Sequence, residues 1–439
     1  MRMARILLKD FAFLPTPDGP VEERSLVIEG GRIARIGEAS ELEAEVGRFD
    51  RVIEGRGRLV MPGLVNAHTH LAMVLFRGYA DDLPLREWLE EAIWPAERHL
   101  EPKEVYWASL LGIAELLRSG VTAFADMYFY MDEVARAVEA SGIRAQLSYG
   151  MIAPDRERAE RELAKGLELV ERWHGQADGR ITVALAPHAP YTCGEWLWQR
   201  AVEEAQEHGI MIHTHLSETA QEVADSRARH GKSPVEYLAD LGVFAAPVLA
   251  AHCVHLSDRD IEILAENKVQ VVHNPSSNMK LGSGIAPVQR LLAAGVNVAL
   301  GTDGAGTNNN LDMWEELRLA ALLAKVGGDP TALPAPQALK LATVNGAQAL
   351  GLEGVGPLRE GMAADLIILD LEGPHLTPQY NLASNLAYAL NSADVETVIV
   401  AGEVLMEGRE IKSFDEAEAK ARVRELSEKY KEIRRSRWD

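Results

Sequence analysis

The sequence has 439 residues, a length that suits a large barrel with an accessory unit. Its formal net charge of -21 repels phosphate backbones, so nucleic acid is not expected as a partner. No apolar stretch is long enough to span a bilayer and the N-terminus lacks a secretory apolar core, so we expect no membrane association. The two cysteines, Cys193 and Cys253, provide no disulfide framework, and they favour a cytoplasmic location.

The first 60 residues have the texture of short strands and turns. An apolar run at 25–28 and another at 32–36 flank the pair Gly30-Gly31. Two strand-like runs separated by a glycine pair predict a β-hairpin.

The middle of the chain, residues 61–360, alternates helical and strand patterns. Residues 102–118 predict a helix and residues 121–126 the next strand. A helix at 133–141 then precedes a strand at 143–149. This alternation indicates βα units and a parallel sheet, so we predict an α/β fold built on a (β/α)8 TIM-like barrel.

Strand-like texture returns at 364–370 and 395–406, before a charged helix over 415–435. Neither end of the chain is long enough for a robust core of its own. We therefore predict that residues 1–60 and 361–439 together form one small β-sandwich, with the C-terminal helix outside the barrel.

The segment 59–70 is the most informative part of the sequence. An apolar run that predicts a buried strand ends there in His68-Thr69-His70. Side chains alternate along a strand, so the two imidazoles lie on the same side, spaced to hold one metal ion.

Three later apolar runs also end in residues that bind metals or move protons. The first ends in His215 and Glu218, the second in His252 and the third in Asp303. In a barrel of parallel strands, active-site residues come from the C-terminal ends of several strands, so these residues are expected to converge.

A metal site follows from four of these residues, His68, His70, His215 and Asp303. Three imidazoles and one carboxylate suit zinc, with iron or manganese as alternatives. One position stays open for water, whose pKa a divalent ion lowers toward ~7. For Asp303, an ordinary β-turn role before a glycine is the alternative.

Glu218 lies three residues beyond His215, where it reaches the water as general base and then acid without binding the metal. His252 can hydrogen-bond the same water or the developing alkoxide. His213 shares a strand face with His215 and could also point inward, but His215 lies at the strand end beside Glu218.

A single metal ion per chain is predicted, because the strand at 181–191 has no Lys, Asp or Glu to bridge two ions. One metal with a glutamate base suits attack on an amidine-like carbon, as in deamination of a purine or pyrimidine. The His-x-Glu…Pro-Cys-x-x-Cys signature of the other zinc deaminase fold is missing.

These residues resemble the amidohydrolase superfamily and, within it, the 5′-methylthioadenosine/S-adenosylhomocysteine deaminases. The resemblance covers essentially the whole chain and rests on PGLVNAHTH (62–70), LFRG (75–78), PHAPY (187–191), AHCVHL (251–256), HNPSSNMKL (273–281), GTDG (301–304) and GMAADL (361–366). Several of these motifs are shared with guanine deaminases and triazine hydrolases, whereas the segment 81–97 discriminates better.

The resemblance implies a role in substrate binding for three residues. Glu97 would bind the ribose hydroxyls, Trp88 would form an apolar wall for the 5′-thioether side, and His188 would donate to the nucleoside. Without the resemblance, the sequence would favour Trp88 as a core residue of an amphipathic helix and Glu97 as a solvent-exposed residue at a helix end.

The chain departs from the family at the arginines that can grip the homocysteine carboxylate. One such position holds Tyr149, while Arg161 is the candidate for the other, with Arg156 and Arg158 nearby. S-adenosylhomocysteine is therefore expected to gain little over methylthioadenosine.

The predicted reaction is hydrolytic deamination of 5′-methylthioadenosine, S-adenosylhomocysteine or adenosine to the inosine analogue, in which Glu218 moves the proton, His252 stabilises the oxygen and Asp303 passes a proton to ammonia. One alternative is a deaminase or dechlorinase of guanine, a pterin or an s-triazine. Another is a non-catalytic scaffold, which the intact set of ligands disfavours. The sequence leaves the oligomeric state open, a homo-oligomer included.

Overall fold

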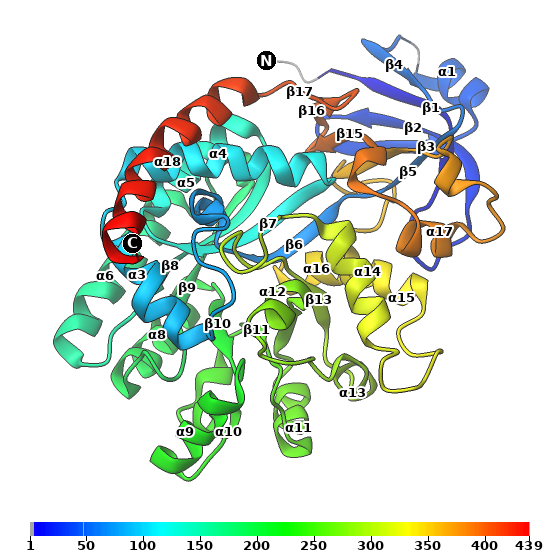
Figure 1. Ribbon diagram of the computed structural model, residues 1–439. Helices are drawn as coiled ribbons and strands as arrows, with labels where there is room; N and C mark the ends of the chain where they lie inside the picture. Colours follow the sequence, from blue (N-terminus) through cyan, green and yellow to red (C-terminus); the bar gives the residue numbers. More distant parts are fainter. Residues whose placement is uncertain (1–3, 47, 439) are drawn as a thin grey trace.

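The computed structural model describes residues 4–46 and 48–438. Eight parallel strands follow one another around a barrel, each hydrogen-bonded to the next in chain order (Figure 1). The barrel strands are β6 (Leu64–Thr69), β7 (Val121–Tyr128), β8 (Arg144–Met151), β9 (Ile181–Pro187), β10 (Ile212–Leu216), β11 (Val248–His252), β12 (Gln270–His273) and β13 (Val298–Leu300). The predicted (β/α)8 barrel is confirmed.

Side-chain bonds to Asn66 join the last barrel strand to the first. The Thr302 amide donates to Asn66 Oδ1 (3.1 Å), and Asn66 Nδ2 donates to Thr302 Oγ1 (2.7 Å). Gly301 allows this close approach, because a Cβ there would lie 2.9 Å from the main-chain N and O of His68. The ends of β6 and β13 are thereby brought together.

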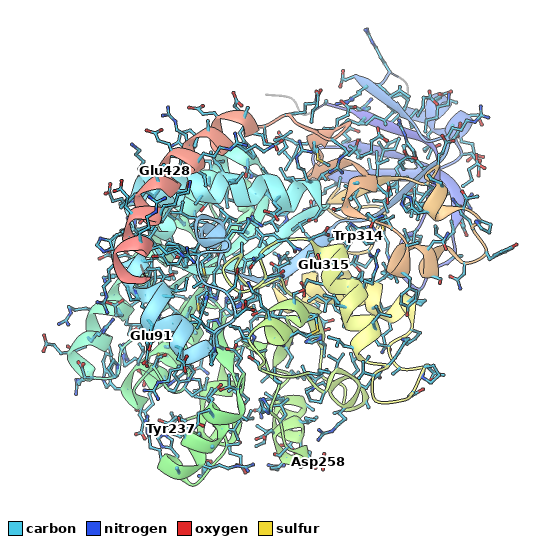
Figure 2. All side chains as sticks on the ribbon, in the orientation of Figure 1. Glu91, Tyr237, Asp258, Trp314, Glu315 and Glu428 are labelled. Carbon is cyan, nitrogen blue, oxygen red and sulfur yellow. The ribbon has the colours of Figure 1, made fainter. Side chains whose placement is uncertain are left out.

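Helices cover the outside of the barrel and turn their apolar faces inward. In α14, for example, Trp314 is buried while the adjacent Glu315 is exposed (Figure 2). The helices of the barrel region are α4 (Pro102–Arg118), α5 (Met131–Ser141), α6 (Arg156–Trp173), α7 (Gln176–Gly179), α8 (Glu195–His208), α9 (Ala220–His230), α10 (Pro234–Asp240), α11 (Asp258–Glu266), α12 (Pro275–Lys280), α13 (Val288–Ala293), α14 (Met313–Leu323), α15 (Ala335–Leu341) and α16 (Val344–Ala349).

The connection from β6 to α4 is long and partly helical. It contains a 3-10 helix (Leu71–Phe76), α2 (Leu85–Glu87), a π-helical turn (Trp88–Ile93) and α3 (Trp94–Glu97). Such an extended βα loop is a common place for binding residues on a rigid scaffold.

Strands from both chain ends form a second sheet beside the barrel (Figure 1). Its strands are β1 (Ile6–Phe13), β2 (Glu22–Glu29), β3 (Arg32–Gly37), β4 (Arg51–Glu54), β5 (Arg58–Pro62), β14 (Leu366–Asp370), β15 (Val395–Val400), β16 (Glu403–Glu407) and β17 (Glu410–Ile411), with the short helices α1 (Ala39–Val46) and α17 (Leu382–Tyr388) in the same parts of the chain. β5 pairs antiparallel with β14, which joins the two ends as predicted. The glycine-pair hairpin between β2 and β3 is also confirmed.

Two polar contacts join the barrel to the C-terminal part of the chain. Arg144 at the start of β8 forms a buried, two-bond ion pair with Asp365, just before β14 (2.8 and 3.1 Å). The C-terminal helix α18 (Glu416–Trp438) packs along α4, where Tyr430 Oη donates to Glu104 Oε2 (2.7 Å). The division of the chain at residues 60 and 360 stays a prediction. None of the helices within 4–46 and 48–438 combines the length and apolar character that a membrane span requires.

Candidate active site

Five predicted residues meet at the C-terminal ends of the barrel strands. His68 and His70 come from the end of β6, His215 from β10, His252 from β11, and Asp303 from the turn after β13. Each of these strands is buried along its whole length, which explains why an apolar run leads to each residue. This is the face on which barrel enzymes carry their active sites.

Several of the candidate ligand atoms lie close to one another, in the two groups His68, His70, Asp303 and His68, His215, His252. His70 Nε2 lies 3.2 Å from both His215 Nε2 and Asp303 Oδ1, and His68 Nε2 lies 3.5 Å from Asp303 Oδ1. Zinc–nitrogen bonds of about 2.0–2.1 Å in tetrahedral geometry place neighbouring ligands about 3.3 Å apart. The three observed distances are therefore compatible with ligands of a shared divalent ion.

The hydrogen bonds of the Nδ1 atoms of His70 and His215 determine which ring nitrogens carry lone pairs toward the cluster. His70 Nδ1 lies 2.5 Å from the Met127 carbonyl oxygen, and His215 Nδ1 lies 2.8 Å from the His188 carbonyl oxygen. A carbonyl only accepts, so both Nδ1 atoms carry the proton and both Nε2 atoms present lone pairs to each other. His68 Nε2 is likewise buried without a hydrogen-bond partner in the described structure. Lone pairs that face each other at this distance are stabilised by a cation between them, so this arrangement supports a divalent-metal site.

Burial and charge set the protonation of these groups in favour of metal binding. Burial lowers the pKa of His68 to about 4 and that of His215 well below its usual value, so both rings are neutral. Burial opposes the charge of Asp303, but the adjacent His68 (3.5 Å) and the other nearby histidines hold its pKa well below the usual range. Ser277 (2.6 Å) and Thr307 (3.0 Å) donate to Asp303 Oδ2 and fix the carboxylate.

His213 points inward, the orientation that the sequence left open. Its Nε2 lies 2.9 Å from Nδ1 of His68, and Ser148 Oγ lies 3.3 Å from its other ring nitrogen. His213 therefore orients the His68 ring from behind, while His215 lies in the candidate ligand cluster.

Glu218 and His252 face each other beside the ligand cluster. Glu218 Oε2 lies 3.7 Å from His252 Nε2, and Asn278 Oδ1 lies 2.9 Å from the other ring nitrogen of His252. Burial raises the pKa of Glu218. Burial also opposes charge on His252, yet the carboxylates of Glu218 and Asp303 outweigh it and raise its pKa. The pair is thus arranged to exchange protons with a molecule bound between them and the metal site.

A pocket opens over the cluster, and His70, His215 and Asp303 form part of its wall. The predicted substrate-binding residues Trp88, Glu97 and His188 line it, together with Glu218 and His252. Trp88 is fixed by a bond from its Nε1 to the Ala80 carbonyl oxygen (3.1 Å), which leaves its ring as an apolar wall.

Glu97 is half-buried at the pocket wall, where Tyr128 Oη donates to its Oε1 (2.6 Å). Burial raises the pKa of Glu97 to about 7, although the bond from Tyr128 lowers it. His188 also lines the pocket, with Nδ1 3.1 Å from Thr192 Oγ1 and a pKa that burial lowers to about 3. A neutral His188 and a titratable Glu97 therefore offer the pocket two different polar contacts.

Arg161, the remaining predicted substrate contact, lies away from the pocket. It is on α6, more than half exposed, and paired with Glu157 (2.6 Å). A second cavity beside the pocket is instead lined by Tyr149, whose hydroxyl donates to Glu162 (2.6 Å), and by Arg158. Arg161 therefore lines neither of these two cavities, and we do not include it among the proposed substrate contacts.

Sequence reasoning missed several residues that shape the site. Tyr128 follows a strand predicted to end at residue 126, whereas β7 runs two residues further. Placing that strand end correctly would have identified Tyr128. Asn278 and Ser277 lie in a motif noted in the sequence, but nothing there showed that they bond His252 and Asp303.

The comparisons with known proteins agree with this geometry. The model of the amidohydrolase family matches residues 59–405. The 5-methylthioadenosine/S-adenosylhomocysteine deaminase of Dictyoglomus thermophilum is 50% identical over 430 residues, which cover 97% of this chain and 100% of the relative. The 5′-deoxyadenosine deaminase of Methanosarcina acetivorans is 51% identical over 97% of this chain and 98% of its own length.

A solved structure shares both the barrel and the terminal sheet. The adenosine deaminase from Xanthomonas campestris, determined with bound zinc, superposes with a TM-score of 0.91 at 36% identity and covers 99% of both chains. Identity of this extent over nearly the whole length goes beyond a shared fold. The chain is thus a hydrolytic enzyme of the amidohydrolase family and belongs, within it, to the 5′-methylthioadenosine/S-adenosylhomocysteine deaminases.

Proposed function

We propose that this enzyme removes the 6-amino group of adenine from 5′-substituted adenosines, among them 5′-methylthioadenosine, S-adenosylhomocysteine and adenosine, to give the inosine analogue and ammonia. The observation that carries the proposal is the pairing of Glu218 with His252 beside a metal cluster, in a pocket that also presents Glu97. The names of its half-identical relatives, a methylthioadenosine/S-adenosylhomocysteine deaminase and a 5′-deoxyadenosine deaminase, support the substrate class.

We propose one zinc ion per chain, held by His68, His70, His215 and Asp303. A set of three imidazoles and one carboxylate supports zinc, and the related adenosine deaminase contains zinc. When bound, such an ion lowers the pKa of a water molecule toward ~7 and makes it a nucleophile at neutral pH.

The side chains around the pocket then carry the protons of the reaction. Glu218 accepts a proton from the water that attacks C6 and delivers it to N1 of the ring. His252 hydrogen-bonds the oxygen atom that adds to C6. Asp303 helps to pass the second water proton to the amino group, which leaves as ammonia while the C6–O bond becomes a carbonyl.

Substrate contacts follow from the pocket wall. Glu97 accepts hydrogen bonds from the ribose hydroxyls, with Tyr128 holding its other side. Trp88 provides an apolar surface for the 5′ group, and His188 bonds the nucleoside as a neutral ring.

Substrate comparison in the wild type and in Glu97→Ala tests the proposal. Methylthioadenosine, S-adenosylhomocysteine and adenosine should be good substrates, while free adenine and guanine should be poor. A 2′,3′-dideoxy substrate removes the ribose donors and leaves Glu97 with only its bond from Tyr128, which costs at least ~1–3 kcal/mol in kcat/KM. Glu87→Ala, an exposed glutamate on the same connection, is the matched control.

Two results of that experiment would overturn the substrate assignment. Guanine could exceed every nucleoside in kcat/KM, or Glu97→Ala could leave the nucleoside values unchanged. Either outcome favours another heterocycle as substrate and leaves the metal chemistry intact.

A further inference from the structure

The turn that carries Glu218 has a main-chain conformation that needs outside support. β10 ends at Leu216, and the next residue, Ser217, has a φ of 51°. This left-handed region is uncommon for residues other than glycine and costs free energy unless surrounding contacts hold it. Glu218 follows immediately, so the position of its carboxylate depends on how firmly this turn is fixed.

Both oxygens of the Glu222 carboxylate bind this turn. The Ser217 amide donates to Oε1 (3.0 Å) and the Glu218 amide donates to Oε2 (2.8 Å). Glu222 lies in the first turn of α9, where its own amide donates to Thr219 Oγ1 (3.1 Å). The Glu222 side chain thus reaches back from α9 to Ser217 and Glu218, which lie just before the N-cap residue Thr219.

The environment of Glu222 is unusual for a glutamate. Its side chain is buried, and among the residues that the structure describes no lysine or arginine pairs with it. Burial raises its pKa to about 7. Burying a carboxylate without a neighbouring cation costs free energy. We relate this cost to the two main-chain amides that the Glu222 carboxylate holds in place.

The opposite side of the turn is bonded to the strand end that carries His252. The Val254 and His255 amides donate to the Ser217 carbonyl oxygen (3.1 and 2.9 Å), and the Cys253 amide donates to the Leu216 carbonyl oxygen (2.9 Å). The turn is therefore held between Glu222 on one side and the residues after His252 on the other.

We propose that Glu222 is a positioning residue, which fixes the main chain of Ser217 and Glu218 so that the Glu218 carboxylate faces His252 and the pocket. This inference rests on the proposed role of Glu218 in proton transfer. Replacing the carboxylate by an amide keeps the size but leaves only one accepting oxygen, so one of the two amides loses its partner.

A double-mutant cycle tests the inference. Glu222→Gln should retain zinc and keep KM within about threefold, while kcat falls on the order of 10²-fold, the scale of a misplaced catalytic group. Glu222 acts through Glu218, so Glu222→Gln should cause no further loss of kcat in a Glu218→Gln background. A purely structural role would instead lower both backgrounds equally.

Asp260→Asn is the matched control for loss of a buried capping carboxylate. Asp260 occupies the same position of α11, and its Oδ2 accepts from the Ser257 amide (2.8 Å). This variant should lose stability but keep kcat. If Glu222→Gln fails to fold, Glu222→Asp keeps both acceptors on a shorter side chain and should lower kcat with the melting temperature nearly retained.

The outcomes separate this inference from the proposed function. An unchanged kcat in Glu222→Gln, or equal losses in both backgrounds, would overturn the positioning role while Glu218 keeps its own. Normal turnover in Glu218→Gln would overturn the proton-transfer role, and the positioning role with it.

Discussion

Main-chain carbonyl groups orient two histidine rings of the site. The Met127 oxygen fixes the ring of His70, and the His188 oxygen fixes that of His215. The ring nitrogens that face the proposed metal position are thus oriented by the protein itself, and loss of one ring removes one of the four proposed ligands.

His70→Ala should therefore lose most of its metal, because an open site has few protein ligands to spare. Elemental analysis of the purified variant, after dialysis, measures this. His99→Ala, an exposed histidine outside the pocket, is the control and should keep the wild-type content. Two ions per active wild-type chain would contradict the single-metal proposal.

Glu218→Gln should fold and keep its metal, yet lose at least ~10² in kcat, the contribution expected of a general acid–base group. Turnover of methylthioadenosine, measured with the metal content known, provides the test. Near-normal turnover would show that the proton moves elsewhere, with Asp303 and His252 as the next candidates.

Glu97 predicts a pH dependence of nucleoside binding. Burial raises its pKa to about 7, so the group is protonated below neutral pH and accepts fewer hydrogen bonds from the ribose. The value of kcat/KM for adenosine should fall as the pH drops through 7. Glu97→Gln should lack this limb, and the same profile in both proteins would refute the assignment.

Among the elements, α18 is attached to the barrel by a buried polar contact. Tyr430 Oη donates to Glu104 Oε2, and Lys429 Nζ lies 2.9 Å from the other oxygen of this buried carboxylate. The amphipathic pattern of α18 therefore accounts for only part of its attachment to α4.

Tyr430→Phe should lower the free energy of unfolding by about 1–3 kcal/mol, because one oxygen of a buried carboxylate loses one of its two donors and keeps the bond from the Glu101 amide. Urea unfolding followed by circular dichroism measures the change. Tyr380→Phe, at a fully solvated tyrosine, should be neutral. Equal stability of both variants would mean that the Tyr430 hydroxyl contributes nothing.

The apolar patterns of the strands and helices explain how much of the fold and of the candidate site could be predicted from the sequence. Buried parallel strands appear in the sequence as apolar runs, so these runs predicted the barrel. The residues directly after the runs predicted the candidate site, because active sites lie at the C-terminal ends of barrel strands. The π-helical turn at Trp88–Ile93 has no such period, and the contact of Tyr128 with Glu97 joins residues 31 positions apart. The capping role of Glu222 depends on the shape of a turn, which no sequence period encodes.

At the scale of the whole molecule, one buried ion pair joins the barrel to the terminal sheet. Arg144 and Asp365 form two bonds, and the Ala401 amide also donates to Asp365 (2.7 Å). Removing one member of such a pair leaves the other charge buried and unpaired.

Asp365→Asn should lower the free energy of unfolding by about 3–5 kcal/mol for this reason. Calorimetry gives the change, with Asp370→Asn on the exposed end of β14 as the control. A melting temperature within a degree of the wild type would show that the pair does not hold the two parts together.

The pairing of β5 with β14 has a consequence for how the protein is made. β5 ends at Pro62 and its partner does not begin until Leu366, so about three hundred residues are synthesised between them. Until β14 leaves the ribosome, one edge of β5 has no strand to pair with, while the barrel is being assembled. The growing chain must keep this edge from joining other chains, and the sheet can be completed only when synthesis is nearly finished.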